Sequence, residues 1–127
     1  MSEQLKLRKV LVVDDDTHTN TMISETLKME NLKVLSALSA EDALQLLNAE
    51  TVDLILLDLV LPGMRGWQFV EKIQENSKTA NIPVMIVSIL SPEDTEIAKN
   101  HPHVFGYVCK PFDINYLIKE IRKAFHE

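Results

Sequence analysis

Short runs of consecutive apolar residues alternate along this chain with longer stretches whose apolar residues recur every three or four positions. Runs that are apolar throughout indicate strands covered on both faces of a sheet, because a strand with one solvated face alternates between apolar and polar residues. The runs that predict strands are residues 10–13, a weaker run at 33–37, and then 54–57, 83–87 and 105–109.

The periodic stretches between these runs predict five helices, one after each strand. Ser39 with Asp42 resembles a capping box in which aspartate replaces glutamate. Ser91 followed by Pro92 is typical of an N-cap and a first helical residue, and Asp113 is expected to cap the last helix. The predicted helices cover residues 19–30, a stretch from Ser39 through Leu47, residues 67–76, a stretch beginning at Ser91, and a stretch from Asp113 through Phe125.

The spacing of apolar residues also predicts which helical faces are buried. The expected inward residues are Met22, Ile23, Thr26, Leu27 and Met29 in the first helix, Phe69, Val70 and Ile73 in the third, and Ile114, Leu117, Ile118, Ile121 and Phe125 in the last. Strands alternating with helices in this way predict an α/β fold with a doubly wound parallel sheet. The chain contains no internal repeat or linker, so residues 1–127 are expected to form a single domain.

Composition narrows the class of partner. Thirteen basic residues against nineteen acidic ones give a net charge of −6, which disfavours direct binding to nucleic acids or to anionic membranes. A single cysteine, Cys109, excludes an intrachain disulfide and is expected to be an inert buried thiol. The polar first nine residues do not resemble a signal peptide, and no apolar run approaches the length of a membrane span. We therefore expect a cytoplasmic protein.

Polar residues follow four of the predicted strands. Asp14–Asp15–Asp16 follows the first, Asp58 the third, Ser88 ends the fourth and Lys110 follows the fifth. Ligands of open parallel sheets bind at the carboxyl ends of the strands, so these side chains are expected to converge. Clustered carboxylates suit a hard cation such as Mg²⁺, and a lysine and a hydroxyl suit phosphoryl oxygens. The set fits phosphoryl transfer to an aspartate, which is a known covalent nucleophile.

The chain also resembles a known family, the receiver domains of two-component response regulators. The resemblance rests on four motifs in the same order and spacing, and it covers the chain from Arg8 to the last helix. The motifs are Val12–Val13–Asp14–Asp15–Asp16, then Asp53 to Asp58 leading to Leu61–Pro62–Gly63–Met64, then Ile82–Pro83–Val84 leading to Ser88, and Tyr107–Val108–Cys109–Lys110–Pro111–Phe112.

This resemblance implies a flavodoxin-like fold, with five parallel strands in the order 2-1-3-4-5 and five helices. It implies that Asp58 is the phospho-acceptor and that Asp15, Asp58 and the backbone carbonyl of Val60 bind Mg²⁺ or Mn²⁺, with Asp14 acting through a metal-bound water. Lys110 would pair with Asp58 and then with the phosphoryl group. No other cofactor is implied.

The resemblance further implies a conformational switch and a set of partners. Ser88 would donate its hydroxyl to a phosphoryl oxygen, and Tyr107 would be the aromatic residue that changes rotamer. The surface formed by the fourth helix, the fifth strand and the fifth helix would change on phosphorylation. The phosphoryl donor would be a histidine kinase or a phosphotransfer protein. The resemblance does not identify the downstream effector domain or protein, and it allows a homodimer that forms on phosphorylation. The domain would be a signalling switch that catalyses only its own phosphorylation and dephosphorylation, not an enzyme acting on a separate substrate.

Several alternative interpretations remain at this point. Asp14–Asp16 alone could be a solvated turn and helix cap, with Asp16 the member most suited to a structural role. Ser88 could be a turn cap, Tyr107 ordinary strand packing, and His101 with His103 a plain loop pair.

Other functions fit the sequence less well than phosphoryl transfer to Asp58. A dehalogenase-like phosphatase needs a second aspartate where Val60 stands. A nucleotide or flavin binder needs a glycine-rich dinucleotide or phosphate loop, and the chain's three glycines cannot form either motif. A degenerate receiver that acts only as an interaction module is the remaining alternative, although it would not need the retained carboxylates and lysine.

Overall fold

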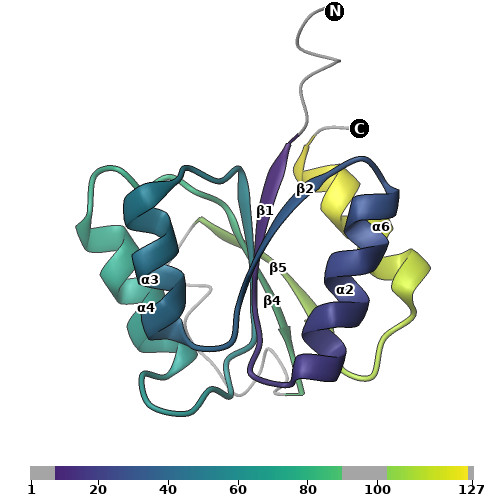
Figure 1. Ribbon diagram of the computed structural model, residues 1–127, viewed down its shortest axis with the longest axis horizontal. Helices are drawn as coiled ribbons and strands as arrows, with labels where there is room; N and C mark the ends of the chain where they lie inside the picture. Colours follow the sequence, from purple (N-terminus) through teal and green to yellow (C-terminus); the bar gives the residue numbers. More distant parts are fainter. Residues whose placement is uncertain (1–7, 90–102, 126–127) are drawn as a thin grey trace, which may run out of the picture.

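The computed structural model describes residues 8–89 and 103–125. Its centre is a five-stranded parallel sheet in the order β2-β1-β3-β4-β5, which confirms the predicted fold class and strand order (Figure 1). The strands are β1 (Lys9–Val13), β2 (Lys33–Ala37), β3 (Leu54–Leu57), β4 (Val84–Ser88) and β5 (Val104–Cys109).

Helices cover both faces of this sheet, as a doubly wound fold requires. Helices α2 and α6 lie on one face, and α3 and α4 lie on the other (Figure 1). The described helices are α2 (Thr17–Met29), α3 (Ala40–Ala49), α4 (Gly66–Glu75) and α6 (Ile114–Ala124). The remaining predicted helix, which begins at Ser91–Pro92, falls outside the described residues. In the part of the chain that is described, no helix is long and apolar enough to cross a membrane.

Two hydrophobic cores result from the alternation of side chains along each strand. On β1, Val10 and Val12 face the core beneath α2 and α6, whereas Leu11 and Val13 face the core beneath α3 and α4. All four side chains are at most 1% exposed, so the all-apolar sequence of β1 reflects burial on both faces. The predicted inward residues of α4 and α6 are confirmed as members of these cores or as neighbours packed against them.

The predicted buried face of the first helix was partly wrong. Met22 is 43% exposed and Met29 is 82% exposed, whereas Ile23 and Leu27 are buried as predicted. Each residue rotates the helix by about 100°, so Met22 and Met29 share a side turned away from Ile23. The positions that complete the buried stripe are polar, namely Asn20 and Ser24.

The prediction for Cys109 was also wrong, because this thiol is exposed. Successive side chains on a strand point to opposite faces, and Val108 points into the core beneath α2 and α6. Cys109 therefore points to the other face. It is the last residue of β5, an edge strand of the sheet.

Candidate functional site

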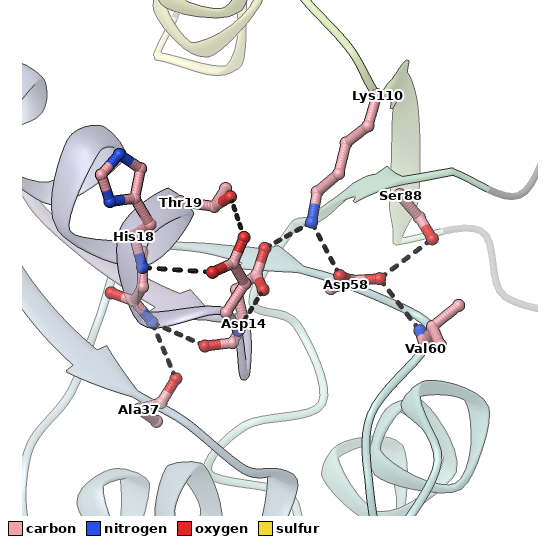
Figure 2. Close-up of polar contacts among 10 residues, drawn as sticks. Asp14, His18, Thr19, Ala37, Asp58, Val60, Ser88 and Lys110 are labelled. Carbon is pink, nitrogen blue, oxygen red and sulfur yellow. Dashed lines mark hydrogen bonds and ion pairs between the residues drawn. The ribbon is translucent and has the colours of Figure 1, made fainter.

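The register of the sheet brings the predicted site residues together at its carboxyl edge. Val13 of β1 pairs with Leu57 of β3, so Asp14 and Asp58, the residues that follow, lie on adjacent strands. Ser88 of β4 pairs with Cys109 of β5, which places Lys110 just beyond Ser88. Figure 2 shows Lys110 reaching between Asp14 and Asp58, with Ser88 on the other side of Asp58.

Asp58 has the most complete set of contacts in this group. Its side chain is nearly buried, at 7% exposure for the residue. Lys110 Nζ donates to Asp58 Oδ2 at 2.8 Å, and both Ser88 Oγ, at 3.0 Å, and the Val60 backbone N–H, at 2.9 Å, donate to Oδ1. Charge-assisted hydrogen bonds to both oxygens fix the orientation of the carboxylate.

Lys110 also pairs with the first aspartate of the acidic run, since its Nζ lies 2.7 Å from Asp14 Oδ2. Burial raises the pKa of the Asp14 carboxyl, and the hydrogen bond from Lys110 offsets this only in part. Burial lowers the pKa of the Lys110 ammonium, but its hydrogen bonds to Asp14 and Asp58 together raise it above the ordinary value. Lys110 therefore remains a cation between two carboxylates.

Three carboxylates at this edge form a group that fits a hard metal ion. Oxygens of Asp14, Asp15 and Asp58 all lie within 4.8 Å of one another. Asp14 and Asp58 are buried, whereas Asp15 is exposed, so the group opens to solvent on one side. An all-oxygen donor set with room for water is the kind that Mg²⁺ prefers. The residues present therefore fit the predicted metal, and the Val60 carbonyl as a ligand stays a prediction.

Asp16 has the structural role suggested for it. It is the N-cap of α2, where Oδ1 accepts a hydrogen bond from the His18 backbone N–H at 3.2 Å and Oδ2 accepts one from Thr19 Oγ1 at 2.7 Å. The hydrogen bond from Thr19 lowers the pKa of Asp16, in contrast to that of Asp14. Asp16 is thus engaged by its own helix and does not belong to the metal-binding group.

The remaining predicted residues lie around this centre. Tyr107 is half-buried on β5, where it pairs with Ile86 and packs against the core beneath α3 and α4. Its role as a switch stays a prediction. His103 Nδ1 lies 3.0 Å from Gln74 Nε2, as suits a histidine in a structural loop, and His101 lies outside the described residues.

Sequence reasoning missed one polar residue that supports the site. Asn20 is only 2% exposed, and its Nδ2 lies 3.0 Å from both the Asp14 and the Ala37 carbonyl oxygens. The helical spacing of the sequence could have identified Asn20. Asn20 lies three residues before Ile23 and seven before Leu27, so it occupies an inward position of α2, where a polar residue needs partners.

Comparisons with known proteins agree with this geometry. A family model described as the response regulator receiver domain matches residues 10–122. Protein PilH of Pseudomonas aeruginosa is 29% identical over 115 residues, which cover 91% of this chain and 95% of PilH. The high-resolution structure of the chemotaxis response regulator CheY4 of Vibrio cholerae superimposes with a TM-score of 0.87 at 28% identity, covering 94% of this chain and 99% of CheY4.

Longer relatives also match. The phosphate regulon transcriptional regulatory protein PhoB of Escherichia coli is 30% identical over 115 residues, which cover 91% of this chain but 50% of PhoB. The chain thus spans about half the length of this curated relative. The family match, the fold and the arrangement of the strand-end residues lead to one conclusion. The chain belongs to the family of response regulator receiver domains of two-component systems.

Proposed function

We propose that this receiver domain accepts a phosphoryl group on Asp58 in a reaction that requires Mg²⁺ or Mn²⁺. The observation that carries the proposal is the environment of Asp58. It is a nearly buried carboxylate that receives hydrogen bonds from Lys110 and Ser88 and lies within a group of three aspartates. A role limited to protein interaction would not need this arrangement, because burying two carboxylates side by side, as Asp14 and Asp58 are, is costly.

The chemistry follows from these contacts. A carboxylate oxygen of Asp58 forms a bond to phosphorus, and the bond between phosphorus and the donor's histidine nitrogen breaks. The released imidazole takes up a proton. Lys110 and Ser88, which now donate to the Asp58 oxygens, are placed to donate to the transferred phosphoryl oxygens instead. Such donors stabilise the negative charge of the phosphoryl group during transfer.

Asp15 and Asp58, with the backbone carbonyl of Val60, would hold the metal ion, and Asp14 would act through a water bound to that ion. When bound, the ion supplies positive charge that offsets the repulsion between the carboxylates and the incoming phosphoryl group. Lys110 offsets part of that repulsion already, through its contacts with Asp14 and Asp58.

Partners and location belong to the same proposal. The phosphoryl donor is a histidine kinase or a phosphotransfer protein, and Ser88 with Tyr107 passes the change to the surface near β5 and α6. A downstream effector, or a second copy of the domain, then reads that surface. We further propose that the domain acts in the cytoplasm and does not itself contact nucleic acid, in keeping with its net charge of −6.

Intact-mass measurement tests the proposal. The protein is incubated with a small acyl-phosphate donor, with Mg²⁺ in one sample and with a chelator in another. We expect one added phosphoryl group in the presence of Mg²⁺, and none in chelator or in the Asp58→Asn variant. Equal labelling in chelator, or labelling of Asp58→Asn, would overturn the proposal.

A further inference from the structure

The turn between β1 and α2, which contains Asp14 and Asp15, is attached to the buried side chain of Asn20, which lies one turn into α2. Its Nδ2 donates to the Asp14 carbonyl and to the Ala37 carbonyl, both at 3.0 Å. One amide group thus ties α2 to the end of β1 and to the end of β2.

The direction of this amide is fixed by its neighbours. Both carbonyl oxygens can only accept hydrogen bonds, so the amide nitrogen must face them. The amide oxygen accepts from Ser24 Oγ, at 3.2 Å, and from Ser36 Oγ. Both N–H groups and both sides of the oxygen are therefore used, and a fully satisfied buried network of this kind holds a single geometry.

We infer that Asn20 is a positioning residue for the metal-binding group. The Asp14 carbonyl belongs to the peptide bond that joins Asp14 to Asp15, so holding that carbonyl sets the direction in which the Asp15 side chain leaves the turn. The Asp14 side chain is held in addition, because its Oδ1 accepts from the Asp16 N–H at 2.9 Å. Asn20 thus acts on the carboxylates through the backbone, without touching an ion.

Loss of the Asn20 amide would affect the two carbonyls differently. The Ala37 carbonyl would keep a donor, because it also accepts from the Asp14 N–H at 3.1 Å. The Asp14 carbonyl would lose the side-chain donor, and a buried carbonyl without a partner favours a turn that reaches water. We expect the peptide between Asp14 and Asp15 to reorient, which separates the carboxylate oxygens that now lie within 4.8 Å.

The inference rests on the proposed function, and a Mg²⁺ titration tests it, followed by the fluorescence of Trp67, the chain's single tryptophan and the second residue of α4. Asn20→Ala is compared with Ser24→Ala, which removes another member of the same buried network but leaves both carbonyl contacts in place. We expect Asn20→Ala to weaken Mg²⁺ binding by about tenfold or more, as is typical for residues that orient metal ligands. Ser24→Ala should leave Mg²⁺ affinity close to that of the wild type, although both variants lower the urea midpoint.

Two further readouts separate positioning from general stability. At saturating Mg²⁺, the rate of phosphorylation of Asn20→Ala should return to near the wild-type rate, because only occupancy of the metal site has changed. Without metal, hydrogen exchange at the Asp16 amide should be faster in Asn20→Ala than in Ser24→Ala. If Asn20→Ala fails to fold, Asn20→Ser provides the same comparison, since its hydroxyl is too short to reach both carbonyls.

The outcomes distinguish this inference from the proposed function. If the wild type binds Mg²⁺ and Asn20→Ala binds it equally well, Asn20 is not a positioning residue, while the proposed function stands. If both alanine variants weaken Mg²⁺ binding to the same degree, the effect is one of general stability and the inference is overturned. A wild type that does not bind Mg²⁺ overturns the proposed function and this inference with it.

Discussion

The three consecutive aspartates after β1 have three different environments. Asp14 is buried and ion-paired with Lys110, Asp15 is exposed within the carboxylate group, and Asp16 caps α2. Sequence alone predicted that the run has both structural and chemical members. The structural reason for the division lies in the turn, whose backbone is held by Asn20 and by the Asp14 carboxylate.

Substitutions in this run should separate metal binding from helix capping. Asp15→Ala removes an oxygen of the group and should abolish Mg²⁺ binding, as seen in a titration followed by Trp67 fluorescence. Asp16→Ala removes the N-cap hydrogen bonds and should lower the urea midpoint while leaving Mg²⁺ affinity nearly unchanged. Equal losses of Mg²⁺ affinity in the two variants would show that the roles have been assigned to the wrong aspartates.

As the pH is lowered, Mg²⁺ binding should begin to weaken at a higher pH than it would if Asp14 had the ordinary pKa of an aspartate. Burial raises the folded-state pKa of Asp14 above the ordinary value for an aspartate, so the fold favours the protonated form. The stability that protonated Asp14 contributes is present below the unfolded pKa and is lost as the pH rises through the folded pKa. Mg²⁺ competes with that proton, because the bound ion favours the ionised carboxylate.

We therefore expect Mg²⁺ affinity to fall as the pH is lowered, with the decline beginning above the range in which an ordinary aspartate titrates. Lys110 stays charged throughout, since its pKa is raised. Mg²⁺ titrations at a series of pH values measure the effect, and Asp14→Asn is the matched control. A Mg²⁺ affinity that falls only within the pH range in which an ordinary aspartate titrates would contradict this expectation.

Among the elements, strands were easier to predict than helical faces. The runs in β1 and β3 are apolar throughout because both faces of each strand are buried. Such a run is recognised as a strand even when its predicted bounds are misplaced by one residue. In α2 the buried stripe contains Asn20 and Ser24, so apolar spacing pointed partly to Met22 and Met29 instead. Asn20 could have been recognised from its helical spacing to Ile23 and Leu27, but the partners that satisfy its amide lie on other elements and could not be read from the sequence.

The element after β3 depends on close backbone contact at Gly66, the first residue of α4. A Cβ added to Gly66 would lie 2.7 Å from Leu59 Cα and 3.1 Å from the Asp58 carbonyl oxygen. Alanine gains about 1 kcal/mol of helix propensity over glycine, but overpacking against backbone costs about 1–3 kcal/mol. We expect Gly66→Ala to lower the free energy of unfolding, because the contacted backbone belongs to the segment that holds Asp58.

Urea denaturation measures this effect, and Gly106→Ala on β5 is the control. The nearest atom to an added Cβ there is Met85 Cγ at 3.9 Å, an ordinary contact. Gly106→Ala should therefore be neutral or slightly stabilising, as replacing glycine within a strand reduces the entropy of the unfolded chain. A Gly66→Ala variant at least as stable as the wild type would show that α4 can move away from Leu59 without cost.

At the scale of the whole molecule, the site and the predicted output surface are joined through two strands. Ser88 ends β4 beside Asp58, and β4 pairs with β5 along Tyr107 and Cys109. The fold and strand order were predictable because the strand-end motifs stand in a recognisable order, whereas Asp58 as the phospho-acceptor stays a prediction. The effector was not predictable, because similar proteins include both short ones such as PilH and longer ones such as PhoB.

Phosphorylation of Asp58 should change the conformation of residues that lie away from Asp58. New phosphoryl oxygens next to Ser88 favour one of two packings of the β4–β5 edge, and the shift in population should reach Tyr107 and α6. Backbone amide spectra of the free and phosphorylated protein measure this, with Asp58→Asn treated identically as the control. Changes restricted to residues around Asp58 would indicate a phosphate sink and not a switch.

Chemical mapping of the phosphorylated residue shows whether Asp58 is the phospho-acceptor. Borohydride reduces an aspartyl phosphate to homoserine, which peptide mass analysis locates in the sequence. After incubation with an acyl-phosphate donor and Mg²⁺, we expect homoserine at position 58 and at no other position. Homoserine at Asp14 or Asp15, or a phosphoryl group on His18 with Asp58 unmodified, would contradict it.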